Sequence, residues 1–378
     1  MKRLAVAGLS ARALAEQAAR EGFEVVALDL FGDRDTLAAA SRWLPIGDAA
    51  ASLRIDGPRL LAALDTLVAD NAVEGWVAGS GFDGRADLLA QAAARLPLLG
   101  NDAATVRRVR DPRDFFATLA VHGVVHPEVR HEGPVPAQDW LLKDAGDSGG
   151  RHVRAAEGLA AALPGALHYL QRAQAGTPMS ATFIANGSAV VVLGCNEQLV
   201  GPVGGAPHAF RGVVGPLRCA PPLQRQVDEA LHTLVPAFGL RGLCSLDFIC
   251  DVNGCIHVLE VNPRPPASLA LYGELQGGLL RAHLAACREA TLPTGALPIS
   301  PLRGTEIVHA RRPMRLSDAG ADWLAAQPDT HDLPRGTMTL SPGDPLCSVE
   351  AAGDDATVIK QRLALRCEAL LSTLEDRA

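Results

Sequence analysis

The chain has 378 residues, 48% of them hydrophobic and 20% charged, which is enough for about two or three packed domains. Its formal net charge of −7 and the lack of a long basic run argue against a nucleic-acid-binding surface. No stretch approaches the roughly 20 apolar residues of a membrane span, and the N-terminus lacks a signal-peptide pattern. We therefore expect a cytoplasmic protein that acts on small molecules, with no nucleic-acid or membrane partner.

The eight cysteines are scattered and form no CxxC pair. Paired spacings of that kind are typical of zinc sites, and even sets in short secreted chains are typical of disulfide frameworks. The sequence therefore indicates neither a zinc site nor disulfides, and it fits a reducing compartment.

Residues 3–100 alternate apolar strands with alanine-rich helices, which predicts a doubly wound α/β layer. The turn after the first strand, AGLSAR, lacks the second and third glycines of a dinucleotide site. We expect a nucleotide-type fold that now forms one wall of a substrate site. The turn GSGFDG at 79–84 is either a ligand loop or a plain flexible loop. The expected strands are Arg3–Ala7, Glu24–Leu28 and Gly75–Ala78, and the expected helices are Ala11–Glu21, Pro58–Asn71 and Arg85–Arg95.

Lys143 is conspicuous because only three of the 35 basic residues are lysines. It ends a short apolar run and is followed by DAGDSGGRHV, a loop containing Gly149 and Gly150. A strand that ends in lysine and leads into bare backbone amides is a design that can hold nucleotide phosphates. Taken alone this is a weak signal, since the loop matches neither common phosphate-binding motif.

The stretch SLDFICDVNGCIHVLEVNPRP predicts a β-hairpin with a turn at Asn253-Gly254. That register places Asp247 opposite Glu260 and turns Asn262 to the same face, because side chains alternate along a strand. Two opposed acids repel each other unless a cation joins them. Two carboxylates and an amide oxygen suit Mg²⁺, whereas the plain alternative is a surface hairpin with solvated acids. Leu246, Phe248, Leu259 and Val261 are predicted to face the core.

Two further segments have open interpretations. The loop GPVGGAPHAFRGVVGP contains His208, Phe210 and Arg211, and Arg211 is either a carboxylate ligand or a solvated surface arginine. The segment GDPLCSVEA near the C-terminus looks like part of a biotinyl-carrier hairpin, but no lysine stands at its tip. We expect a small β module followed by a terminal helix.

The order of the motifs along the chain resembles that of the ATP-grasp superfamily, close to carboxylate–amine ligases and other ATP-dependent carboligases related to biotin carboxylase. These motifs are, in order, Lys143, the DSGG loop, the hinge-like stretch 170–176, Asp247 and LEVNPRP. The resemblance implies a mixed α/β (α+β) fold with a Rossmann-like N-terminal domain, a two-lobed ATP cleft and a small C-terminal β-rich module. We place the four units at residues 1–100, 101–175, 176–295 and 296–378.

The resemblance also implies roles for individual residues. Lys143 would contact the nucleotide phosphates, and Arg264 would face the transferred phosphoryl group or the acyl phosphate. The remaining assignments are Ser148, Gly149 and Gly150 in the loop above the phosphates, Gln171, Arg172 and Ala173 near the adenine, and Asp247, Glu260 and Asn262 as ligands of Mg²⁺, with Mn²⁺ as the alternative ion.

Two positions depart from the family pattern. A second lysine is expected before a helix near VRRVRDPRDFF, where this chain offers Arg110 or Arg113 instead. The hinge acid that contacts adenine or ribose is also missing, and Arg172 stands in that region. The sequence thus leaves the α-phosphate and ribose contacts open.

The activity implied by the resemblance is formation of an acyl phosphate from a carboxylate and ATP, followed by attack of an amine. The subgroup it suggests accompanies one-carbon cofactor synthesis of the methanopterin and methanofuran type, with an amino acid such as glutamate as substrate. The alternatives are a carboxylase that uses bicarbonate and a nucleotide-binding protein without catalysis. The partners would be small carboxylates and amines, and a homodimer is compatible with this assignment.

Overall fold

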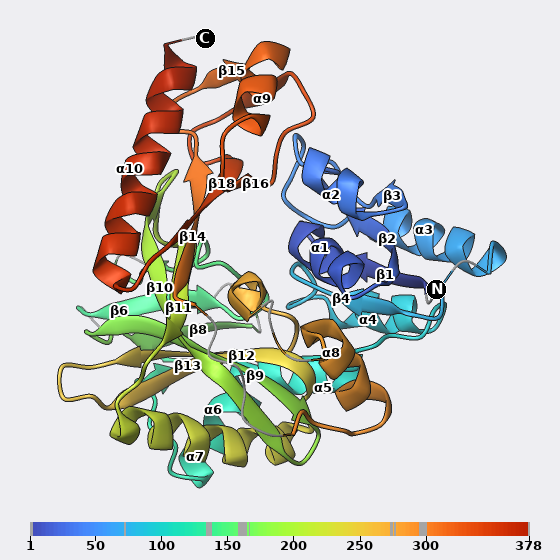
Figure 1. Ribbon diagram of the computed structural model, residues 1–378. Coiled ribbons are helices and arrows are strands. Elements are labelled where there is room, and N and C mark those ends of the chain that lie inside the picture. Colours follow the sequence, from blue (N-terminus) through green and yellow to red (C-terminus); the bar gives the residue numbers. More distant parts are fainter. Residues whose placement is uncertain are drawn as a thin grey trace.

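The protein is described by a computed structural model that covers residues 3–71, 73–133, 138–157, 165, 167–272, 275, 277–294 and 301–376. An α/β unit at the N-terminus packs beside a large antiparallel sheet that carries helices on its outer faces (Figure 1). None of the helices in these ranges has the length and apolar character needed to cross a bilayer.

The N-terminal unit is a parallel sheet with strand order β3-β2-β1-β4. The predicted strands and helices are present with small changes at their ends, whereas β3 and α2 were not predicted. β3 is a partly exposed edge strand that ends in proline, and α2 has only 6 residues, so neither gives a strong periodic signal. The elements are β1 (Arg3–Ala7), α1 (Arg12–Arg20), β2 (Glu24–Asp29), α2 (Arg34–Ala39), β3 (Arg42–Pro45), α3 (Gly57–Ala69), β4 (Trp76–Ala78) and α4 (Ala86–Ala93).

Two short helices lead into a small sheet that lies over the large one (Figure 1). Asp111 ends the first helix, and its carboxylate caps the second by accepting from the backbone N–H groups of Arg113 and Asp114. The small sheet has the order β5-β8-β6-β7. These elements are α5 (Ala103–Arg110), α6 (Pro112–Val121), β5 (Val129–Arg130), β6 (Trp140–Asp144), β7 (Arg154–Ala155) and β8 (His168–Arg172).

The large sheet has the order β13-β12-β9-β10-β11-β14-β18-β16. Strands from before residue 262 and after residue 303 therefore share one sheet, in which β14 pairs with β11. A separate pair, β15 and β17, lies near the C-terminus. The strands are β9 (Thr177–Asn186), β10 (Val190–Val203), β11 (Ala206–Leu217), β12 (Arg241–Cys250), β13 (Ile256–Asn262), β14 (Arg303–His309), β15 (Met314–Leu316), β16 (Thr330–His331), β17 (Met338–Leu340) and β18 (Pro345–Ala352).

Three apolar clusters hold these layers together. One joins α6 and α7 to β9, β12 and β13. A second joins α1 and β1 to α8 and to residues of β9, β11 and β12, so the N-terminal unit shares a core with the large sheet. A third packs α9 and α10 against β14 and β18. The remaining helices are α7 (Pro221–Phe238), η1 (Ala267–Tyr272), α8 (Leu279–Arg288), α9 (Asp318–Ala325) and α10 (Ala356–Glu375).

The β12–β13 hairpin has the predicted pairing of Asp247 with Glu260, but it does not have the predicted two-residue turn. The loop instead closes between Asp251 and Cys255, with Gly254 at φ 77°. This three-residue loop shifts the register by one residue. A β-bulge between the Asp247 and Phe248 pairs shifts it back, and the two deviations cancel at the acids.

Because of the bulge, the predicted direction of one side chain, that of Leu259, is wrong. Leu246, Phe248 and Val261 are fully buried as predicted, but Leu259 is only partly buried and lines a large cavity. Val258 takes the core position, because Phe248 pairs with Val258 instead of Leu259.

Candidate active site

A cavity of about 670 Å³ lies between the small sheet, the large sheet and the N-terminal unit. Pockets of this size accommodate cofactors and small substrates. The residues to which the resemblance assigns individual roles all line this cavity. They are Lys143, Ser148, Gly149, Gly150, Gln171, Arg172, Ala173, Asp247, Glu260, Asn262 and Arg264.

The acid pair lies on the floor of the cavity, where β12 and β13 are adjacent. Asn262 pairs with Ser245, and its amide nitrogen donates to Asp247 Oδ2 at 3.1 Å and to Ser245 Oγ at 3.2 Å. These two hydrogen bonds fix the amide group beside Asp247. Two carboxylates and a side-chain amide thus converge from adjacent strands.

The pKa values of the two carboxylates are shifted in opposite directions. Burial, and then the charge of Glu260, raises the pKa of Asp247 to about 7. Burial alone would raise the pKa of Glu260 as well, but Arg110 and Lys143 bring it below its ordinary value. Asp247 is therefore the carboxylate whose charge lacks compensation. A divalent cation that takes oxygen ligands would supply the missing positive charge, so this set of side chains fits Mg²⁺.

Lys143 stands at the end of β6 and is 7% exposed. Its ammonium donates to Gln171 Oε1 at 3.2 Å and lies 5.8 Å from the ring centroid of Tyr169. Burial opposes the charge, yet Tyr169 and Glu260 raise the pKa of Lys143 above its ordinary value. The lysine therefore carries its charge inside the cavity.

Tyr169 was missed by the sequence analysis. It pairs with Lys143 across β6 and β8, and burial raises the pKa of its hydroxyl. The signal in the sequence is the short run HYLQR, which reads as a strand before the hinge. Without the pairing register, nothing in that run connects Tyr169 with Lys143.

The glycine loop is pressed against β11. Gly149 and Gly150 have φ values of 73° and 71°, which favour glycine. A Cβ on Gly150 would lie 2.0 Å from the carbonyl oxygen of His208, so a side chain does not fit there. Phe210 N–H donates to the carbonyl of Gly149 at 2.8 Å. The loop therefore closes one side of the cavity through backbone contacts.

Arg110 and Arg113, the two replacements considered for the second lysine, differ in position. Arg110 is 4% exposed and donates to Glu260 Oε2 at 3.0 Å. Its other nitrogens donate to the carbonyls of Ala145 at 2.9 Å and Asp147 at 2.8 Å. Arg113 is exposed on α6. The structure thus brings Arg110, and not Arg113, to the acid pair.

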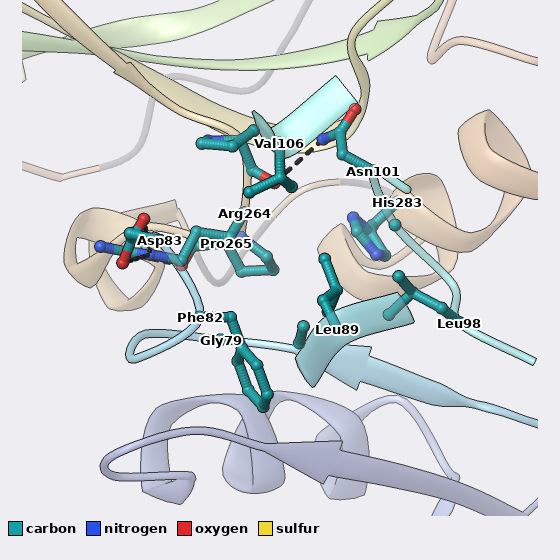
Figure 2. A pocket seen from close by; sticks show the side chains of 13 residues that line it. Gly79, Phe82, Asp83, Leu89, Leu98, Asn101, Val106, Arg264, Pro265 and His283 are labelled. Atoms are coloured by element: carbon teal, nitrogen blue, oxygen red, sulfur yellow. Dashed lines mark hydrogen bonds and ion pairs between the residues drawn. The ribbon is translucent and has the colours of Figure 1, made fainter. Parts of the chain in front are cut away.

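Arg264 is anchored by a residue of the N-terminal unit. Its Nε lies 3.0 and 3.1 Å from the two carboxylate oxygens of Asp83, which is 5% exposed (Figure 2). Burial would raise the pKa of Asp83, but Arg264 and Arg110 hold it below its ordinary value. The GSGFDG turn therefore positions the arginine of the NPRP motif, a role that the sequence did not reveal. The adjacent cavity in Figure 2 measures about 20 Å³, room for about one water molecule.

The hinge and the β10–β11 segment complete the walls. The ammonium of Lys143 can only donate a hydrogen bond, so the oxygen of the Gln171 side-chain amide faces it. The nitrogen of that amide, Nε2, therefore points away from Lys143. That Nε2 atom is buried, with no hydrogen-bond partner in the described part of the chain. His208 and Phe210 line the cavity, whereas Arg211 forms an ion pair with the buried Glu306. Neither predicted role of Arg211 describes that ion pair.

The chain is similar to one protein family and to several solved structures. Residues 109–268 match a family described as an ATP-grasp domain. No curated protein matches the chain. Among solved structures, biotin carboxylase from Campylobacter jejuni, described as a β,γ-ATP complex, matches with TM-score 0.71 at 14% identity over 98% of this chain and 95% of that one.

Two other solved structures match to a similar degree. L-amino acid ligase from Bacillus licheniformis has TM-score 0.69 at 16% identity, covering 100% of this chain and 97% of that one. The biotin carboxylase domain dimer of 2-oxoglutarate carboxylase from Hydrogenobacter thermophilus, with MgADP and bicarbonate, has TM-score 0.71 at 12% identity, covering 96% and 88%. At these identities the likeness concerns the fold.

Proposed function

Because this chain carries an ATP-grasp domain and has the ATP-grasp fold along nearly its whole length, we propose that it is an ATP-dependent ligase that activates a carboxylate as an acyl phosphate. The supporting observation is that Lys143, the opposed acids and Arg264 line one cavity. In the proposed reaction a carboxylate oxygen attacks the γ-phosphorus of ATP and ADP leaves. An amine then attacks the acyl carbon, phosphate leaves, and the nitrogen loses a proton.

Nucleotide binding is assigned to the small sheet and the glycine loop. The charge of Lys143 would face the phosphates, while Ser148, Gly149 and Gly150 would cover them with backbone amides. Residues 171–173 would meet the base, where the buried Gln171 Nε2 offers a donor. Arg110 is fixed by three partners beside Glu260, so we assign it to orienting the acid.

The metal site is assigned to Asp247, Glu260 and Asn262, with Mg²⁺ as the ion and Mn²⁺ as the alternative. A bound ion would neutralise charge on the transferring phosphoryl group. The chain's own contribution is rigid placement: Asn262 is tied to Asp247, and Glu260 is tied to Arg110. Such preorganised charges contribute most where water is excluded.

Arg264 is assigned to the transferred phosphoryl group and the acyl phosphate. Asp83 binds its Nε, one terminal nitrogen makes a long contact of 3.5 Å with the carbonyl of Pro265, and the residue lines the cavity. A planar, multi-donor cation suits phosphoryl oxygens. The glycine loop against β11 would keep water from the reactive intermediate.

The acceptor is proposed to be an amine, so that the enzyme would be a carbon–nitrogen ligase. An amino acid of the glutamate type, in cofactor synthesis of the methanopterin or methanofuran kind, is the substrate suggested by the sequence resemblance. The bicarbonate in the Hydrogenobacter structure supports a carboxylase as the second candidate. That structure is also a dimer, which supports a homodimer here, and a cytoplasmic location remains our proposal.

A screen tests this function. Purified protein with ATP and Mg²⁺ is supplied with a panel of carboxylates, each with and without amines, and ADP and phosphate release are measured. Amine-dependent release supports the ligase, and bicarbonate-dependent release supports the carboxylase. ADP binding without turnover of any pair would favour a nucleotide-binding protein without catalysis.

The metal assignment has its own test. Glu260→Gln keeps the shape of the side chain and removes its charge, so it should abolish the activity found in the screen. An unchanged rate in this variant would refute the site. Absence of Mg²⁺-dependent ATP binding to the wild-type protein would refute the whole assignment.

A further inference from the structure

The tip of the β12–β13 hairpin carries a group of side chains of the types that serve as metal ligands, outside the cavity lining. It consists of Asp251, Cys255 and His257, whose ligand atoms all lie within 4.8 Å of one another. All three residues are partly exposed, so a cation can reach them from solvent. We call them the tip cluster.

The strand geometry itself brings the tip cluster together. Asp251 N–H donates to the carbonyl of Cys255 at 2.9 Å across the loop, so their side chains share a face. His257 is two residues beyond Cys255 and therefore points the same way. It pairs directly with Ile249, which lines the nucleotide cavity. The cluster thus continues the hairpin face that carries Asp247.

Backbone contacts hold the carboxylate in place. Asp251 Oδ1 accepts from the N–H groups of Asn253 at 2.8 Å and Cys255 at 3.0 Å, and Oδ2 faces His257 Nε2 at 3.1 Å. The position of the carboxylate is therefore fixed by two backbone N–H groups of its own loop.

Helix α7 fixes the loop as well. Gln226 donates to the carbonyl of Gly254 at 2.8 Å and accepts from Ile256 N–H at 3.1 Å. The loop is therefore tied to the core before any ligand binds. Preformed geometry of this kind lowers the ordering cost of binding.

We propose that the tip cluster binds a zinc-type divalent transition-metal ion. Carboxylate, thiolate and imidazole are the ligand types of such sites, whereas Mg²⁺ takes oxygen ligands. In a tetrahedral site with bonds of about 2.0 Å, nitrogen and oxygen ligands lie roughly 3.3 Å apart. The observed separation of 3.1 Å between Asp251 Oδ2 and His257 Nε2 is close to that value. Water would fill the fourth position.

A turn cap plus an ion pair would explain Asp251 and His257 but not the position of Cys255. Its thiol makes one long contact, 3.8 Å to the carbonyl of Ile256. On metal binding the thiol would lose its proton and His257 Nε2 would present a lone pair, so protons are released. The ion would join β12 to β13 close to Asp247 and Glu260, and would stabilise the hairpin that carries them.

Titration of the full-length protein with Co²⁺ tests the proposal, because a cobalt–thiolate bond gives a near-ultraviolet charge-transfer band. One equivalent of Co²⁺ should produce the band, and Zn²⁺ should displace it. Cys255→Ser and His257→Ala should each lose the band and weaken Zn²⁺ binding at least about tenfold. Cys367→Ser, which alters a partly buried thiol on α10, should keep both.

Two further measurements separate this site from the cavity acids and from misfolding. Glu260→Gln should keep the cobalt–thiolate band, because that residue belongs to the other site. Zn²⁺ should raise the melting temperature of the wild type but not of Cys255→Ser, whose metal-free melting temperature should match that of the wild type. No thiolate band in the wild type, or an undiminished band in Cys255→Ser, would overturn the proposal.

Discussion

Two charged groups line the same cavity, and they differ in how completely their charges are compensated. At the β12–β13 end, Asp247 has a pKa raised to about 7 because burial and Glu260 disfavour its charge. At the end near the N-terminal unit, Arg12 lies 2.9 Å from Glu16, 2.8 Å from Asp332 and 3.7 Å from Asp35. At the first end Asp247 has no ion-pair partner in the described part of the chain, whereas at the second end Arg12 contacts three carboxylates. Burial and the charges of Asp332, Asp29 and Asp35 nevertheless raise the pKa of the neighbouring Asp33 to about 9.

We assign the reaction to the β12–β13 end and a structural role to the Arg12 end. Asp332 follows β16, and its backbone N–H donates to Asp35 at 2.7 Å, so the Arg12 network joins the C-terminal strands to the N-terminal unit. Compensated charges of this kind fix the relative position of parts of a chain. Uncompensated buried charges mark candidate sites for chemistry.

Replacing Lys143 should give the largest effect. Lys143→Met removes the buried cation that faces the proposed phosphate position, and the rate found in the ADP-release screen should fall on the order of 100- to 1000-fold. The matched control is Lys360→Met, because Lys360 pairs with Glu197 at 2.7 Å and lies outside the cavity lining. Equal rates for the two variants would remove Lys143 from the reactive end.

Arg110 should matter for stability as well as for activity. Arg110→Met leaves the buried acids Glu260 and Asp83 without their shared cation, which should lower the free energy of unfolding by about 3 kcal/mol. Arg113→Met, on the exposed face of α6, should change it by less than about 0.5 kcal/mol. Urea unfolding of both variants measures the difference, and a loss of similar size in both would contradict the assignment.

Arg12 tests the structural end. Arg12→Met breaks the contacts to Glu16 and Asp332, and the free energy of unfolding should fall by about 2 kcal/mol. ADP affinity, measured by calorimetry, should stay within about twofold of the wild type, since we assign the nucleotide to the other end. A large loss of ADP affinity with unchanged stability would reverse the roles of the two ends.

How far the sequence predicts the site depends on the distance between partners along the chain. The pairing of Asp247 with Glu260 was predictable because a short hairpin with period-two alternation fixes which residues face each other. The pairing was right although the loop was not, since the bulge at Leu259 compensates the longer loop. The pairing of two opposed residues in a hairpin can thus be predicted correctly even when the predicted turn is wrong.

Contacts between distant segments were not predictable. Arg264 and Asp83 are 181 residues apart, and Lys143 meets Tyr169 through a strand pairing across an intervening loop. The tip cluster was missed because Asp251, Cys255 and His257 match no paired-cysteine spacing, and only the hairpin loop brings them together. The roles of the predicted site residues remain predictions until the variants above are measured.

The smallest expected effect is the part of the pH dependence that Asp247 contributes. The buried Asp33, whose pKa is raised to about 9, contributes a decline of the same sign, which a substitution of Asp247 should leave in place. The Asp247 pKa of about 7 in the folded protein lies above its ordinary value of 3.8, so the folded state binds more protons than the unfolded state between these values. The contribution of Asp247 to the stability of the metal-free protein should therefore fall as the pH rises from about 4 to 7, and Asp247→Asn should remove that contribution. Urea unfolding at pH 5.5 and 8 should show a smaller decline in the variant, by on the order of 1 kcal/mol. Because Mg²⁺ with ADP would favour the ionised carboxylate, it should reduce the same decline in the wild type. An identical pH dependence in all three samples would mean that the charge of Asp247 is already compensated in the metal-free protein.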